Sequence, residues 1–141
     1  MSNHVFLIDI TGTCNLRCPS CPTGNFAAVD FADSPRPLGF MPIEKFEAIL
    51  ARIAEIRNGA ITPIRLYNWG EPLLHPKAPE FISRVRAYRN FRCAVSSNLS
   101  LSKVDLDAVV AAAPHWMRWT CVPASMIISP ASTTQARAYS R

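Results

Sequence analysis

Three cysteines in one short segment are the residues whose types and spacing best suit chemistry. Cys14, Cys18 and Cys21 follow a C-x3-C-x2-C pattern, so a single loop could place all three thiolates around one metal centre. Neighbours this close make poor partners for a disulfide framework, and the chain's total of 5 cysteines is odd. An iron–sulfur cluster with only three cysteine ligands keeps one iron open to a small exchangeable ligand.

Two other interpretations of these thiols stay open. A structural zinc site needs four ligands in a closed tetrahedron and could recruit His4, His75, Cys93 or Cys121, although the paired C-x2-C units typical of zinc knuckles are absent. The thiols could also be ordinary buried side chains, but three loop cysteines this close rarely serve packing alone. We expect Cys93 and Cys121, which lie in apolar segments, to be such buried small hydrophobes.

The elements that must position the cysteines alternate between strand and helix patterns. We expect strands over residues 4–10, 62–67, 91–96 and 116–122, with helices over residues 42–57, over residues 79–88, and between a capping box at Ser102 and Asp105 and the break at Pro114. The apolar stripes expected to face the core are Phe46, Ile49, Leu50, Ile53 and Ile56, then Phe81, Ile82 and Val85, then Leu106, Val109 and Val110. This alternation predicts an α/β fold with parallel strands and right-handed crossovers.

The cysteines come directly after the first expected strand, in a long segment rich in Gly, Pro, Ser and Asp over residues 11–40. A loop of that length inside a compact domain is usually functional. The carboxyl ends of parallel strands are also where barrel folds place their chemistry. We therefore expect the metal centre at the carboxyl end of the first strand.

The cysteine spacing after an N-terminal strand resembles the cluster motif of the radical S-adenosylmethionine (SAM) superfamily. The resemblance implies that Cys14, Cys18 and Cys21 hold a 4Fe–4S cluster whose open iron chelates the amino and carboxylate groups of SAM. It further implies reductive cleavage of SAM to methionine and a 5′-deoxyadenosyl radical, which abstracts hydrogen from a substrate. The fold implied is a partial parallel (β/α)6 barrel, truncated here to about the first three to four βα units.

A second matching segment follows the second expected strand. Gly70, Glu71 and Pro72 are similar to the end of the family's Gly-Gly-Glu-Pro type motif, with Trp69 in place of the first Gly. The resemblance implies that this backbone and Glu71 bind the amino group of SAM. We therefore expect the segment to contact only the ligand and to govern SAM affinity rather than cluster assembly. Taken alone, it could be a turn and a helix start.

Polar residues also end the first and third expected strands. Ser96 and Asn98 resemble a Thr-Asn-Gly-like element that the family places near SAM, although Ser and Asn are common turn formers. Asp9 could face the mouth of the barrel or cap the loop. Ser20 stands where the family often has an aromatic residue near the adenine of SAM, so adenine contacts would come from elsewhere.

The length of the chain limits how much of the barrel it can form. Six βα units need about 190 residues, and the chain has 141. We expect residues 1–122 to form the N-terminal part of a radical SAM core and residues 123–141 to be a C-terminal tail that the pattern does not place. A catalytically incompetent iron–sulfur fragment is therefore the main alternative to an active enzyme.

Net charge and hydropathy indicate which partners and which location to expect. The net charge of +5 is spread without runs of like charge or a basic stripe with interleaved aromatics, so no nucleic-acid partner is expected. No uninterrupted apolar stretch reaches the roughly 18 residues of a membrane span, so we expect a cytoplasmic protein. The family resemblance implies a peptide or small-molecule substrate and an electron donor such as flavodoxin or ferredoxin.

Overall fold

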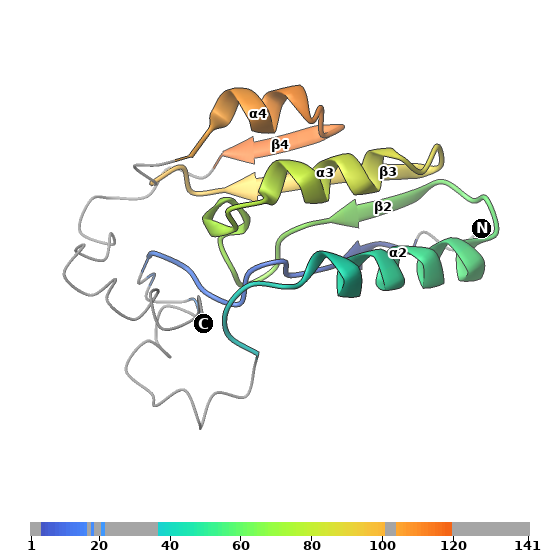
Figure 1. Cartoon of the computed structure of the whole chain (residues 1–141), viewed down its shortest axis with the longest axis horizontal. Helices are drawn as coiled ribbons and strands as arrows, with labels where there is room; N and C mark the ends of the chain where they lie inside the picture. Colours follow the sequence, from blue (N-terminus) through green and yellow to red (C-terminus); the bar gives the residue numbers. More distant parts are fainter. Residues whose placement is uncertain (1–3, 17, 19–20, 22–36, 101–103, 120–141) are drawn as a thin grey trace.

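Four parallel strands form one sheet in a computed structural model that describes residues 4–16, 18, 21, 37–100 and 104–119. The strands are β1 (Phe6–Leu7), β2 (Thr62–Arg65), β3 (Phe91–Ser97) and β4 (Trp116–Trp119), and they lie in sequential order (Figure 1). The predicted α/β fold with parallel strands is confirmed. Because the order never reverses, the chain winds in one direction, as in a (β/α) barrel and unlike a doubly wound sheet.

The helices cover one face of this sheet. They are α2 (Ile43–Arg57), α3 (Ala78–Arg86) and α4 (Leu106–Ala111), and a short 3₁₀ helix, η3 (Pro72–Leu74), follows β2 (Figure 1). The core lies between the helices and the sheet, where Phe46, Phe81 and Phe91 are fully buried. Within the described part of the chain, no helix covers the opposite face, and none is long and apolar enough to cross a membrane.

Strand β1 is much shorter than the expected strand over residues 4–10. It pairs with β2 only at Phe6 and Leu7, and the Ile8 amide then donates to the Arg65 carbonyl at 2.8 Å. Beyond that point the chain pairs with a different segment. The Met41 amide donates to the Ile10 carbonyl at 2.9 Å, and Thr11 forms an antiparallel bridge with Phe40. This competing pairing ends the parallel ladder and brings together the two ends of the long loop.

The Gly12 position shows how tightly this loop is closed. The Gly12 amide donates to the Gly39 carbonyl at 2.7 Å, and a Cβ on Gly12 would lie 2.1 Å from the Pro37 carbonyl oxygen. Only glycine fits at such a distance. The segment that contains the cysteines therefore leaves and rejoins the fold at one place.

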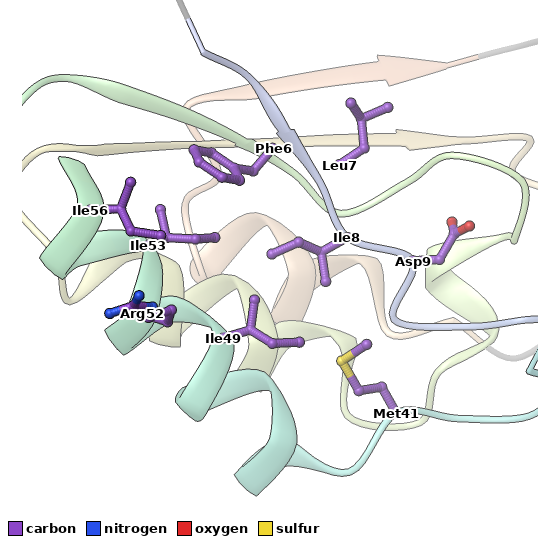
Figure 2. Close-up of a pocket in the computed structure, with 9 residues that line it drawn as sticks. All are labelled: Phe6, Leu7, Ile8, Asp9, Met41, Ile49, Arg52, Ile53 and Ile56. Carbon is purple, nitrogen blue, oxygen red and sulfur yellow. The ribbon is translucent and has the colours of Figure 1, made fainter.

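Helix α2 agrees closely with the prediction. It begins after Pro42 and ends at Asn58, whose φ of 42° is left-handed and whose amide donates to the Ala54 carbonyl. Phe46, Leu50 and Ile53 are buried as expected, but Ile56 is 59% exposed. Ile56 lines an apolar pocket of about 510 Å³ between α2 and the free edge of β1 (Figure 2). The helix extends past the short strand that would have covered its last turn.

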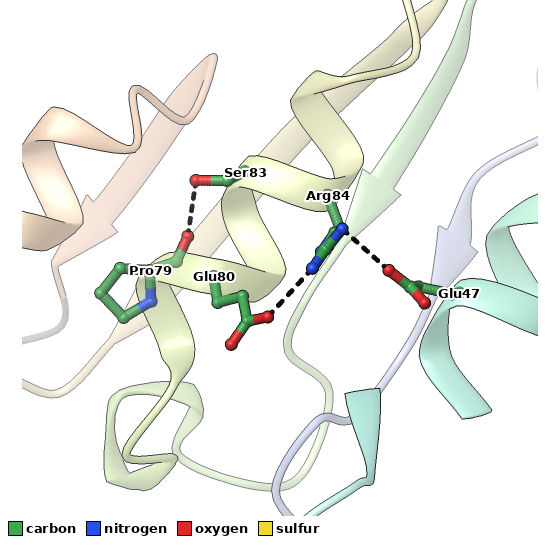
Figure 3. A network of polar contacts seen from close by, with 5 residues as sticks. All are labelled: Glu47, Pro79, Glu80, Ser83 and Arg84. Atoms are coloured by element: carbon green, nitrogen blue, oxygen red, sulfur yellow. Dashed lines mark hydrogen bonds and ion pairs between the residues drawn. The ribbon is translucent and has the colours of Figure 1, made fainter. Parts of the chain in front are cut away.

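Helix α3 buries Ala78, Phe81, Ile82 and Val85, which includes the predicted stripe. An exposed polar network ties it to α2, because Arg84 pairs with Glu47 at 3.0 Å and with Glu80 at 3.2 Å (Figure 3). In the same view, the Ser83 hydroxyl donates to the Pro79 carbonyl at 3.0 Å. Exposed pairs of this kind contribute little, so the buried stripe holds the two helices together.

The capping prediction for α4 was wrong by one turn. Asp105 is itself the N-cap, since its carboxylate accepts a hydrogen bond from the Ala108 amide at 2.8 Å, and Ser102 lies outside the described residues. Only Val109 of the expected stripe is buried, whereas Leu106 and Val110 are 42% and 61% exposed. A short helix over the edge strand finds a partner on one side only. Residues 120–122 of the fourth expected strand, Cys121 and the tail over residues 123–141 also lie outside the described residues, so the boundary at residue 122 stays a prediction.

Candidate functional site

Three loops meet at the carboxyl end of the sheet, where the sequence predicts the chemistry. They follow β1, β2 and β3 and contain the cysteines, the Gly70-Glu71-Pro72 segment and Asn98 respectively. Because parallel strands end at the same edge, residues far apart in the chain come into contact here.

The three loop cysteines are all free and half-buried. The Cys21 amide donates to the Cys18 carbonyl at 3.0 Å, so these two residues are joined directly. Among the described residues, no three Cys, His, Asp or Glu side chains are gathered closely enough to hold a metal ion. The ligand set therefore stays a prediction from the spacing.

Cys14 is half-buried and lies near Glu71. Burial raises the pKa of its thiol to about 11, and the nearby Glu71, Cys21 and Cys18 act in the same direction, against a backbone hydrogen bond from Leu16. The free thiol is therefore protonated at neutral pH. A metal that binds Cys14 must displace this proton, so cluster assembly here is coupled to proton release.

Cys93 has a different environment, as the sequence predicts. It is fully buried in the core on the helix side of β3, and burial raises the pKa of its thiol to about 12. His75, the other described candidate for a fourth zinc ligand in the fold's interior, is held by main-chain partners. Its Nε2 donates to the Met41 carbonyl at 3.1 Å, and its Nδ1 accepts from the Lys77 amide at 3.0 Å.

The Gly70 segment contacts the cysteine loop directly, so the expectation that it contacts only a ligand was wrong. A Cβ on Gly70 would lie 1.7 Å from the Thr11 carbonyl oxygen, and the Glu71 amide donates to the Thr13 carbonyl at 2.9 Å. Glycine is required because two backbones touch at this point. The segment therefore supports the start of the cysteine loop, whatever it contributes to SAM binding.

Asp9, two residues after the end of β1, reinforces the same junction. Its carboxylate accepts hydrogen bonds from the Trp69 amide at 3.2 Å and from the Gly70 amide at 3.3 Å. Of the two alternatives for Asp9, facing the mouth of the barrel or capping a loop, these hydrogen bonds support the loop cap. Trp69, which replaces the family's glycine, is 41% exposed at this mouth.

Glu71 is buried and bridges two loops. One carboxylate oxygen accepts from the Leu73 amide at 3.0 Å and caps η3, and the other accepts from the Asn98 amide at 2.8 Å. Burial raises the pKa of this carboxyl, while these bonds and one from Ser97 oppose the rise. The carboxylate thus has a structural role, and its contact with the amino group of SAM stays a prediction.

Asn98 joins the loop after β3 to the cysteine loop. Its side-chain amide donates to the Asn15 Oδ1 at 3.0 Å and approaches the Cys14 Sγ at 3.7 Å, and Asn15 in turn donates to the Ser100 carbonyl at 2.7 Å. Ser96 lies elsewhere, in the ladder beside Arg118 of β4. The structure therefore brings Asn98, but not Ser96, to the cysteines.

Sequence reasoning missed Thr13 and Asn15, which link the cysteine loop to its two neighbours. Their only signal was polarity beside Cys14. Such residues are common in loops, and their partners lie more than 50 positions away in the chain.

Comparison with known proteins defines the class. The sequence model of the Radical SAM superfamily matches residues 8–118, and the chain belongs to this superfamily. Its members are enzymes that typically bind a 4Fe–4S cluster and SAM. The donor set fits such a cluster, because three free, partly exposed thiols share one loop. No curated protein matches the sequence significantly.

Two solved structures share the fold. Selenomethionine BtrN in an open conformation is 16% identical, with a TM-score of 0.62 over 89% of this chain and 60% of that one. BtrN in complex with AdoMet and 2-DOIA is also 16% identical, with a TM-score of 0.66 over 94% and 56%. The chain therefore spans somewhat over half the length of these structures and matches part of the radical SAM fold.

Proposed function

We propose that the chain binds a 4Fe–4S cluster through Cys14, Cys18 and Cys21 and cleaves SAM reductively to start hydrogen abstraction from a substrate. The observation that carries the proposal is the support around the cysteine loop. Gly70 and Glu71 contact its backbone, and Asn98 reaches both Asn15 and Cys14. A metal site needs supporting contacts of this kind to hold the side chains that bind the metal in place.

The chain's own residues have separable tasks in this proposal. The three thiols lose their protons and bind iron, while the loops after β2 and β3 fix the path of the cysteine loop. SAM would lie against the mouth formed by Gly70, Glu71 and Pro72, with Trp69 partly excluding water. When bound, the cluster supplies the electron that breaks the sulfonium C–S bond. Ser96 would contact SAM or substrate from the open face of the sheet.

The partners follow from this chemistry. The electron would come from a small carrier such as flavodoxin or ferredoxin, and the substrate would be a peptide or small molecule. A reducing compartment such as the cytoplasm suits free thiols. One solved BtrN structure holds AdoMet, which supports SAM as the co-substrate.

A cluster-binding chain without turnover is the second candidate. It is favoured by the open face of the sheet, because no helix or strand among the described residues encloses the space beside the mouth. A radical is useful only where walls exclude water and hold the substrate.

Anaerobic reconstitution tests both candidates. The purified chain would be assayed for iron, sulfide and zinc, and then for 5′-deoxyadenosine after addition of SAM and dithionite. Iron and sulfide with 5′-deoxyadenosine support the enzyme, while a cluster without product supports the second candidate. Stoichiometric zinc without sulfide would refute both.

A further inference from the structure

The face of the sheet opposite the helices carries arginines. The strand register places Arg65 beside Leu7 and Ala94, and it places Arg118 beside Ser96. Figure 2 shows that Leu7 and Asp9 point away from α2, whereas Ile8 points toward it. Since side chains alternate along a strand and register partners share a face, Arg65 and Arg118 lie on the open face.

The buried residues confirm this assignment from the other side. Ile64 precedes Arg65 along β2, and Cys93 and Val95 lie on either side of Ala94 along β3; all three are within the helix-side core. Met117, which precedes Arg118 along β4, packs against that core. The alternate positions must therefore face outward. In a (β/α) barrel this face of the sheet turns inward, and ligands bind at the carboxyl ends of the strands, where Arg65 ends β2 and Arg118 lies next to the end of β4.

Among the described residues, no acidic side chain forms an ion pair with either of these two arginines. Within the described ranges, Arg65 and Arg118 make no ion pair or hydrogen bond. Arg92, the third arginine on this face, donates to the carbonyls of Arg89 and Phe91 at 3.0 and 3.1 Å, toward the amino end of β3. The Asp9 carboxylate is engaged by main-chain amides of the mouth.

The spacing suits one shared anion. Arg65 and Arg118 are two strands apart and offset by two positions, which puts their Cα atoms roughly 12 Å apart. Two extended arginine side chains can span that distance and reach one anion bound between them. The β3 positions between them hold Ala94 and Ser96, whose side chains are short, and the Ser96 hydroxyl adds a donor.

We propose that Arg65 and Arg118 bind a carboxylate or phosphate group of the molecule held against the open face. This inference rests on the proposed function and names the chemical class of what the site takes. Guanidinium groups bind such anions through paired, charge-assisted hydrogen bonds, and two unpaired cations on one face attract an anion before contact. The anion belongs either to the substrate or to SAM itself.

The first test needs no cluster. Titration calorimetry of the full chain with inorganic phosphate should show binding that Arg65→Gln and Arg118→Gln each weaken about tenfold, because each removes one charge-assisted contact. Arg89→Gln, which removes the same charge from the exposed turn before β3, should change the affinity less than twofold. No detectable phosphate binding, or an equal loss in Arg89→Gln, would overturn the proposal.

Two further measurements complete the test. If a glutamine variant loses its thermal unfolding transition, the lysine variant at that position keeps the charge but lacks the planar fork, and it should weaken phosphate severalfold. Unchanged affinity in folded lysine variants would count against the proposal.

On the reconstituted chain, a loss of affinity for SAM but not for decarboxylated SAM assigns the anion to SAM. Unchanged affinity for both assigns it to the substrate. Failure of SAM cleavage alone leaves the phosphate result standing.

Discussion

At the scale of single residues, the described cysteines occupy two environments. Cys14, Cys18 and Cys21 share a half-buried loop, and Cys93 is sealed in the core. Replacing any one of the three by Ala should abolish the brown absorbance of the reconstituted cluster, because each removes one of three protein bonds. Cys93→Ala and Cys121→Ala should retain it. Loss of the cluster in Cys93→Ala, in a variant that still melts cooperatively, would show that the ligand set is misassigned.

The Glu71 carboxylate accepts two main-chain hydrogen bonds while only 3% exposed. Glu71→Gln replaces one acceptor oxygen with a donor that faces another N–H group, so a buried donor is left unsatisfied. We expect the free energy of unfolding to fall by about 1–3 kcal/mol, measured by urea denaturation of the cluster-free chain. The matched control is Glu80→Gln, at an exposed ion pair with Arg84 on α3, which should cost less than about 1 kcal/mol. Equal losses of unfolding free energy in the two variants would show that the buried hydrogen bonds of Glu71 do not stabilise the fold more than an exposed ion pair does.

At the scale of elements, His75 connects the start of α2 to the start of α3. Its two ring bonds, to the Met41 carbonyl and from the Lys77 amide, require the neutral ring with its proton on Nε2. Burial lowers the pKa of His75 below its ordinary value of 6.5. The unfolded chain therefore takes up this proton at higher pH than the folded chain does. Its contribution to stability is present above about pH 6.5 and is lost as pH falls toward the folded pKa.

This linkage can be measured by urea unfolding midpoints at several pH values from 7.5 down to 5.5. The wild-type midpoint should decrease as the pH falls through this range, while His75→Gln, which keeps an acceptor and a donor but does not titrate, should show a smaller decrease. The same slope in both proteins would assign the pH dependence to other groups.

The turn between β2 and η3 acts as a support for the cysteine loop. Gly70→Ala would push a methyl group against the Thr11 carbonyl and displace the loop, so iron bound after reconstitution should drop severalfold. Gly59→Ala is a suitable control, because it meets no atom within 4 Å but has a φ of 80°. It should cost about 1 kcal/mol of stability and leave the iron content unchanged. Full iron binding by Gly70→Ala would contradict the support role.

At the scale of the whole molecule, the sheet is covered on one face and open on the other in the described part of the chain. SAM bound at the mouth would then be held from one side and exposed to water. We expect 5′-deoxyadenosine to form slowly, well below the roughly 1 s⁻¹ at the lower end of typical enzymes. Chromatographic quantitation of 5′-deoxyadenosine in the anaerobic assay measures this rate. A rate in the typical range would show that the open face does not limit cleavage.

Local patterns in the sequence were enough for the elements and the class of chemistry. Helix α2 was predicted almost to the residue, because helical spacing and the Asn58-Gly59 stop act within a few positions of the chain. The cysteine spacing indicated the superfamily that the comparison then established. Both signals are carried by neighbouring residues, so no tertiary contact is needed to read them.

Only the tertiary structure decided the contacts between loops. The early end of β1 depends on competition from residues 39–41, and the Gly70 backbone touches Thr11 because two parallel strands end side by side. The shared face of Arg65 and Arg118 depends on the register of three strands. A shift of one residue in any pairing would turn one arginine into the core. These relations join positions far apart in the chain, and a strand's own residues do not specify its partner or register.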